Sequence, residues 1–188
     1  VTMKKVIITF ILCFPMLAWA DDFDSNQFTL KIQNSNYGIE TRQYTSSERS
    51  HIQIEKYVGK WKFAYRYDEN GSKTEHRPRI DYKLYDNGLV YIKPRVEYRY
   101  YEGTRNDYWR VRSAIGLRVK GMYLEVNPML RLGSGYSNDL SVDEYQTKLG
   151  YKFPLGTKAQ LNMFVQRDSD KDFNKTDMLF GTSLGFRF

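Results

Sequence analysis

The stretch VYIKPRVEYRYYEG, residues 90–103, alternates between two kinds of side chain, and this alternation decides the fold. Successive side chains of an extended strand point to opposite faces. One face takes the mainly apolar Val90, Ile92, Pro94, Val96, Tyr98 and Tyr100. The other face takes Tyr91, Lys93, Arg95, Glu97, Arg99 and Tyr101. The stretch therefore predicts a β-strand between an apolar medium and water. Because soluble sheets also contain such strands, the rest of the chain decides between a soluble and a membrane protein.

The first twenty residues have the pattern of a secretory signal peptide. Two lysines precede an apolar run that ends in the small-x-small sequence AWA at residues 18–20. The run is shorter than the roughly 20 apolar residues of a spanning helix. We expect cleavage near Ala20, so that 1–20 is the signal peptide and 21–188 is one exported domain. Cleavage also removes Cys13, the only cysteine, which excludes disulfides, thiol catalysis and cysteine metal sites.

The composition excludes a helical membrane protein. Aromatic residues make up 16% of the chain, with 16 tyrosines, but the mean hydropathy is −0.64. No apolar run after the signal peptide approaches the length of a spanning helix. An exported, tyrosine-rich chain that is polar on average is either a soluble β protein or an outer-membrane barrel, in which apolar residues are hidden by alternation.

Alternating segments recur along the chain and are separated by turn residues. Ten strands are expected at about 38–45, 50–58, 60–68, 75–85, 89–101, 107–119, 122–133, 143–153, 158–168 and 177–188. Tight connections, such as Asp86-Asn87-Gly88, take turns with longer polar ones, such as 134–142. This order is typical of bacterial barrels with short periplasmic turns and longer external loops. We expect an all-β fold, a transmembrane, antiparallel, up-and-down β-barrel of about ten strands, with twelve also possible.

The outward parity of the predicted strands is rich in aromatic residues. One face of 60–68 carries Trp61, Phe63, Tyr65 and Tyr67, and aromatic residues concentrate near segment ends, as in the girdles at membrane interfaces. The last segment stops at Phe188, a pattern that outer-membrane assembly machinery reads. The alternative, aromatic residues packed inside a soluble sandwich, leaves the highly charged opposite faces unexplained.

One segment does not fit ten strands. Residues 28–35, FTLKIQNS, also alternate, but an eleventh strand would break the even count that returns both ends of the chain to the periplasm. The segment is interpreted either as a periplasmic start or as an extension of the first strand, bent at Asn36 and Gly38.

The side chains that the alternation directs into the barrel include many basic residues. From the third predicted strand to the eighth, they are Lys62, Arg66, Arg77, Arg79, Lys83, Lys93, Arg95, Arg99, Arg110, Arg112, Arg118, Arg131, Lys148 and Lys152. The strand middles oppose them with only Asp81, Glu97 and Glu125. An unpaired charge in a dry interior is costly, so this surplus predicts a wet, positive lumen that favours anions. The alternative is a closed barrel in which arginines are filler paired with carboxylates.

Three stretches carry a family resemblance. EHRPRIDYKLY (75–85), KPRVEYRYYEG (93–103) and NDYWRVRSAIGLRVK (106–120) resemble the central hairpins of the oligogalacturonate-specific monomeric porins, the KdgM family, whose relatives include a sialic-acid channel. The last strands, about 143–188, resemble that family's closing hairpins. The resemblance implies a monomeric outer-membrane channel with a narrow pore, lined by facing basic tracks, that admits acidic oligosaccharides. The implied pore-lining, substrate-binding residues are Arg77, Arg79, Lys83, Lys93, Arg95, Arg99, Arg110, Arg112 and Arg118. The family departs from this chain in being longer and having twelve strands.

Catalysis and nucleic-acid binding are not expected. His76 faces lipid by parity, and His51 opens a strand at an outer loop without an inward serine or aspartate at an arguable spacing. The basic side chains of this exported chain point into a lumen and not onto a surface, which argues against nucleic acid. We therefore expect an anion-selective porin of a Gram-negative outer membrane, without enzymatic activity, cofactor or metal. Its expected partners are acidic oligosaccharides or other anionic solutes, membrane lipid and the assembly machinery that reads Phe188. The alternative is a non-conducting barrel that serves as an adhesin or a structural envelope protein.

Overall fold

The computed structural model describes residues 25–45, 49–71, 73–103, 107–133, 142–173 and 176–188. The signal peptide expected at 1–20 lies outside these residues. The described chain consists of strands β1 (Ser25–Gln33), β2 (Tyr37–Tyr44), β3 (Arg49–Val58), β4 (Trp61–Asn70), β5 (Lys73–Tyr82), β6 (Tyr85–Asp86), β7 (Val90–Tyr101), β8 (Tyr108–Val119), β9 (Met122–Gly133), β10 (Glu144–Leu155), β11 (Ala159–Asp170) and β12 (Thr176–Arg187).

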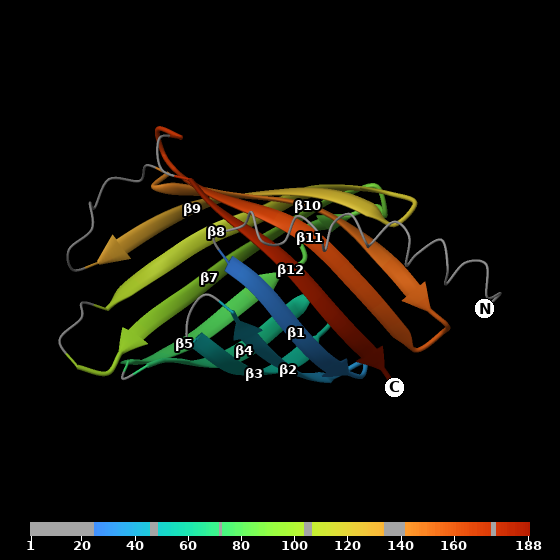
Figure 1. Cartoon of the computed structure of the whole chain (residues 1–188), viewed down its shortest axis with the longest axis horizontal. Coiled ribbons are helices and arrows are strands. Elements are labelled where there is room, and N and C mark those ends of the chain that lie inside the picture. The colour runs from blue at the N-terminus through green and yellow to red at the C-terminus, as the bar shows by residue number, and fades with distance from the viewer. Residues whose placement is uncertain (1–24, 46–48, 72, 104–106, 134–141, 174–175) are drawn as a thin grey trace.

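The strands form one closed β-barrel (Figure 1). Each long strand pairs with its neighbours in sequence, β5 pairs with β7, and β1 closes the barrel against β12. Eleven strands therefore form the wall, and β6 is one extra short strand. The predicted all-β barrel is confirmed. Its strand number lies between the ten expected and the twelve held possible.

The closing pair differs from the up-and-down prediction because β1 and β12 run parallel. Thr29 lies opposite Ser183, and the pairing continues in register from Ser25 to Gln33. The segment 28–35, interpreted above as a periplasmic start or a bent extension, is mostly a separate strand. Its alternation lets it fill the gap between β2 and β12, with the apolar Phe28 and Ile32 facing outward.

The predicted strand 75–85 is split by a bulge. Asp81 of β5 lies opposite Arg95 of β7, and Tyr85 of β6 lies opposite Ile92 of β7. Between these two pairs the β5–β6 side has three residues, 82–84, and β7 has two, 93–94, so the β5–β6 side has one extra residue. Such an extra residue is a β-bulge, which bends the strand locally. β6 is therefore the continuation of β5, and Lys83, expected within the strand, lies in the connection between them.

The two ends of the barrel differ in their connections. The turn end carries the connections at 34–36, 59–60, 83–89, 120–121 and 156–158. The loop end carries those at 45–48, 71–72, 102–107, 134–143 and 171–175. Lys120 and Gly121 have φ values of 47° and 93°, which suits a two-residue hairpin turn with two left-handed residues. The connection between the strands expected at 60–68 and 75–85 has only two residues, because β4 and β5 both extend into it.

The assignment of faces along the strands is confirmed. Trp61, Phe63 and Trp109 are exposed on the outside of the barrel. His76 also faces outward, where the Tyr65 hydroxyl lies 2.5 Å from its Nδ1 and Glu102 Oε1 lies 3.0 Å from its Nε2. The outside is thus apolar and aromatic, and polar side chains lie inside.

A charge placed on the outer face tests this orientation. Ile115 lies in the middle part of β8 and is 47% exposed on the outside. We expect Ile115→Arg to lower the free energy of unfolding from lipid vesicles by about 2–4 kcal/mol, because arginine is costly near the bilayer midplane. Denaturant titration in vesicles measures this difference. The neighbouring inward variant Ala114→Gln is the control, and an equal loss in both variants would contradict the orientation.

Candidate functional site: a basic lumen

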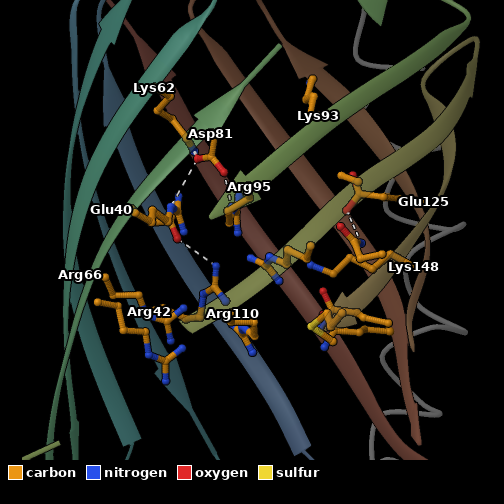
Figure 2. Close-up of a pocket in the computed structure, with 18 of the residues that line it drawn as sticks. Glu40, Arg42, Lys62, Arg66, Asp81, Lys93, Arg95, Arg110, Glu125 and Lys148 are labelled. Atoms are coloured by element: carbon orange, nitrogen blue, oxygen red, sulfur yellow. Dashed lines mark hydrogen bonds and ion pairs between the residues drawn. The ribbon is translucent and has the colours of Figure 1, made fainter. Parts of the chain in front are cut away.

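The barrel encloses a cavity of about 790 Å³ whose lining spans both ends (Figure 2). Gly59 and Lys83 line it from the turn end, and Tyr44 and Glu144 line it from the loop end. The lining contains fifteen basic residues and five acidic ones. An anion in this space therefore meets mainly positive side chains.

The cavity brings together eight of the nine residues predicted to line the pore. They are Arg77, Arg79, Lys83, Lys93, Arg95, Arg99, Arg110 and Arg112. Arg118 points inward but lies nearer the turn end, with its guanidinium 4.1 Å from the centre of the Tyr91 ring and 3.3 Å from Asp86 Oδ1. Lys83, whose side chain is half exposed, lies 3.3 Å from the same carboxylate.

The Asp86 carboxylate thus holds Lys83 and Arg118 at the turn end of the barrel. Slight desolvation acts to raise the pKa of this carboxyl. The Gly88 N–H donates to it, and Arg118 and Lys83 lie beside it, so the pKa is lowered overall. The carboxylate form is favoured, and it fixes two of the predicted pore-lining bases at this mouth.

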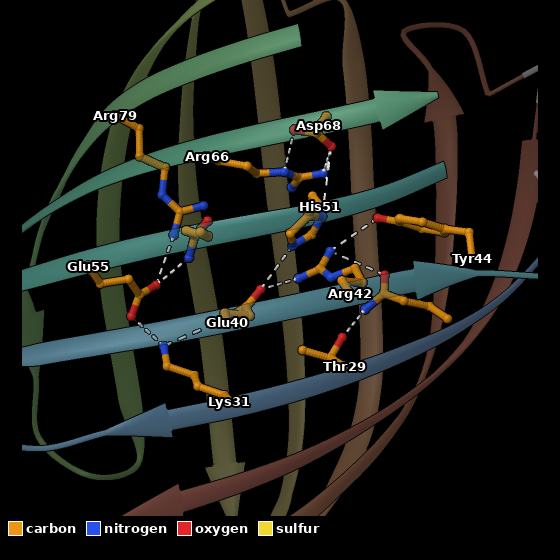
Figure 3. A network of polar contacts seen from close by, with 12 residues as sticks. Thr29, Lys31, Glu40, Arg42, Tyr44, His51, Glu55, Arg66, Asp68 and Arg79 are labelled. Atoms are coloured by element: carbon orange, nitrogen blue, oxygen red, sulfur yellow. Dashed lines mark hydrogen bonds and ion pairs between the residues drawn. The ribbon is translucent and has the colours of Figure 1, made fainter. Parts of the chain in front are cut away.

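A dense ion-pair network covers the wall from β1 to β8, and Figure 3 shows the part of it that lies on β1 to β5. Its centre is the Asp68 carboxylate, which lies 3.2 Å from Arg77 Nε and 3.3 Å from Arg49 Nη2 and also pairs with Arg66. Glu55 plays the same role nearer the turn end and holds Lys31, Lys62 and Arg79. The remaining pairs of the predicted residues are Arg77 and Arg99 with Glu75, Arg79 and Arg95 with Asp81, and Arg99 and Arg110 with Glu97.

The acids of this network lie behind the bases. The side chains of Glu55, Asp68 and Glu97 are at most 2% exposed, and none of the three lines the cavity. Of the guanidinium and ammonium groups that they hold, all except that of Lys31 line it. The charges are therefore layered, with carboxylates against the wall and bases toward the lumen.

The positive surplus expected from the sequence is smaller than predicted. The count of acids covered only the middle parts of the third to eighth predicted strands. It missed Glu40 and Glu55 because they lie on the first and second predicted strands. It missed Asp68 and Glu75 because they lie near strand ends. Inward parity alone would have found Glu55, Asp68 and Glu75, since each shares the face of a predicted base on its own or a neighbouring strand. Glu40 shares the inward face of β2 with Arg42, to which it is paired.

His51 was also placed wrongly. It was expected at the start of a strand near an outer loop, but it is 1% exposed and points into the network. Its Nε2 lies 3.4 Å from Glu40 Oε1, and its Nδ1 lies 3.8 Å from Asp68 Oδ1. The strand begins one residue earlier than expected, so this histidine is its third residue and lies further inside the barrel.

Three bases on the wall from β7 to β12 are held differently. Within the described ranges, no carboxylate oxygen comes within ion-pair distance of Lys93, Arg112 or Lys148. Lys93 and Lys148 lie instead over the rings of Tyr91 and Phe164. An aromatic ring attracts a cation without cancelling its charge. This wall therefore contributes bases whose positive charge remains available to a solute.

A closed β-barrel with an apolar outside and a hollow, charged inside defines the class of the protein: it is compatible with an outer-membrane barrel protein. In the parts of the chain that the structure describes, no helix is long and apolar enough to cross a membrane. No model of a known protein family matches the chain, and no curated protein matches it either.

Proposed function

We propose that the protein is an outer-membrane porin, a diffusion channel that favours anionic solutes. The single observation that carries this proposal is the lining of the lumen, in which bases from both ends face the cavity and most of their acids lie behind them. Closely spaced bases lower the cost of desolvating an anion, and their number lets a solute pass from one to the next without deep trapping. No covalent bond is made or broken.

The proposed substrate class is acidic oligosaccharides, with oligogalacturonate as the example. The resemblance of 75–85, 93–103 and 106–120 to the oligogalacturonate porins supports this class. Guanidinium groups bind carboxylates through two parallel hydrogen bonds, and the cavity offers several of them in succession. The barrel is proposed to act as a monomer.

Planar-bilayer recording with the purified protein tests the channel. Across a salt gradient we expect a reversal potential that shows preference for anions, and a conductance that falls when oligogalacturonate is added. The double variant Arg95→Ser/Arg112→Ser should weaken the preference, because both side chains line the cavity. A channel that prefers cations, or one indifferent to the double variant, would contradict the proposal.

A non-conducting adhesin or structural barrel is the second candidate. The ion-pair network favours it, because paired charges also fill closed barrels and Asp68 alone holds three arginines. The same recording decides between the two. Folded protein that inserts into bilayers without any conductance would support the structural barrel.

A further inference from the structure

Three aromatic rings lie flat against the lumen wall over glycines of the next strand. Tyr91 lies opposite Gly116, Tyr123 opposite Gly150, and Phe164 opposite Gly181. A Cβ atom added at any of these glycines would overlap the opposite ring. Glycine is therefore required at these positions for the rings to lie where they do. The three pairs repeat along β7–β8, β9–β10 and β11–β12.

Each of these rings carries at least one basic side chain. The ammonium of Lys93 lies 4.6 Å from the centre of the Tyr91 ring, that of Lys152 lies 5.2 Å from Tyr123, and that of Lys148 lies 5.3 Å from Phe164. Among the described residues, none of these three lysines has a carboxylate within ion-pair distance. The rings thus take the place that carboxylates have on the opposite wall.

Lys148 shows what this arrangement prevents. Across the β9–β10 pair it lies directly opposite Glu125, where an ion pair is the ordinary outcome. Glu125 instead accepts hydrogen bonds from the Tyr91 hydroxyl, at 2.6 Å, and from Asn127, at 2.9 Å. Lys148 lies over Phe164, and Figure 2 shows it on the same side of the cavity as Glu125. Neighbouring opposite charges are therefore each held by an uncharged partner.

We propose that the rings seated on glycine keep Lys93, Lys148 and Lys152 apart from the acids of this wall, and that Lys148, held over Phe164, is thereby a determinant of anion selectivity. This inference rests on the proposed channel function. A base paired with a buried carboxylate adds little to the local field, whereas Lys148 lines the cavity without such a partner among the described residues. Phe164 and Tyr91 are positioning residues in this scheme, because they act through Lys148 and Glu125.

The test measures the anion-to-cation permeability ratio of variants from the reversal potential. Phe164→Leu keeps every charge but removes the ring, which frees Lys148 to pair with Glu125. We expect the ratio to fall by about twofold, as for loss of one cation–π contact. Phe164→Tyr keeps the ring and should keep the ratio. Lys148→Gln should lower the ratio at least as much as Phe164→Leu.

Tyr108→Leu is the matched control for the loss of a ring. The centre of the Tyr108 ring lies 5.5 Å from the guanidinium of Arg99, but this base is also held by Glu75 and Glu97, so the ratio should not change. An unchanged ratio in both Lys148→Gln and Phe164→Leu, with wild-type protein still preferring anions, would overturn this inference alone. Wild-type protein without anion preference would overturn the proposed function itself.

Discussion

Asp68→Asn should be among the most destabilising single substitutions in this barrel. The side chain of Asp68 is 2% exposed and holds Arg49, Arg66 and Arg77. Removing its charge leaves guanidinium groups next to one another at a buried position. Breaking a buried ion pair by removing one partner costs roughly 3–5 kcal/mol, and we expect a loss of this size in the free energy of unfolding. Urea titration of the folded barrel in vesicles, followed by tryptophan fluorescence, measures it.

Glu69→Gln is the matched control for this substitution. Glu69 is the next residue along β4, but it faces outward and is exposed. Its loss should change the free energy of unfolding by less than about 0.5 kcal/mol. If both variants lose equally little, the arginines around Asp68 are separately hydrated, and the network does not hold the wall together.

A disulfide between Thr29→Cys and Ser183→Cys should form in nearly all folded molecules. The two residues are partners in the parallel pairing of β1 with β12, and adjacent strands lie about 4.8 Å apart, within the Cα separation that disulfides require. The only natural cysteine, Cys13, belongs to the expected signal peptide, so the mature variant should hold no competing thiol. Gel mobility with and without reductant, after mild oxidation of the folded protein, measures the fraction that is linked.

The pair Arg42→Cys and Ser183→Cys is the control for this register. In a ten-strand barrel the segment 38–45 would be the neighbour of the last strand, and this second pair is the one expected to come close. In the eleven-strand barrel β1 lies between β2 and β12, which places these two residues about 9–10 Å apart. Efficient linkage of the second pair, and not of the first, would contradict the parallel closure.

The fold was largely predictable because alternation is a local property of the chain. Residues 90–101 show their two faces within a dozen positions, and the same rule identified the outward Trp61 and the inward Arg110. The closing strand was not predictable in this way. The pairing of β1 with β12 joins the two ends of the described chain, and no local pattern states whether such a pair is parallel.

The positive charge of the candidate site was predictable from the sequence, but the partners of its basic side chains were not. Inward parity identified the bases, such as Arg77 and Arg95, and the structure places them in the lining of one cavity. Their partners depend on which strands are neighbours. Glu55 reaches Arg79 of β5 across β4, and Phe164 reaches Lys148 across the β10–β11 pair. Register between strands fixes these contacts, and a single sequence does not reveal it.

The parallel pairing of β1 with β12 determines on which sides of the barrel the two ends of the described chain lie. β1 starts at the loop end with Ser25, whereas β12 finishes at the turn end beside Phe188 (Figure 1). In an up-and-down barrel with an even count, both of these points share one side. Here they lie at opposite ends of the barrel, so in a barrel that spans a bilayer, epitope tags fused immediately before Ser25 and after Phe188 would be recognised by antibodies applied from different sides.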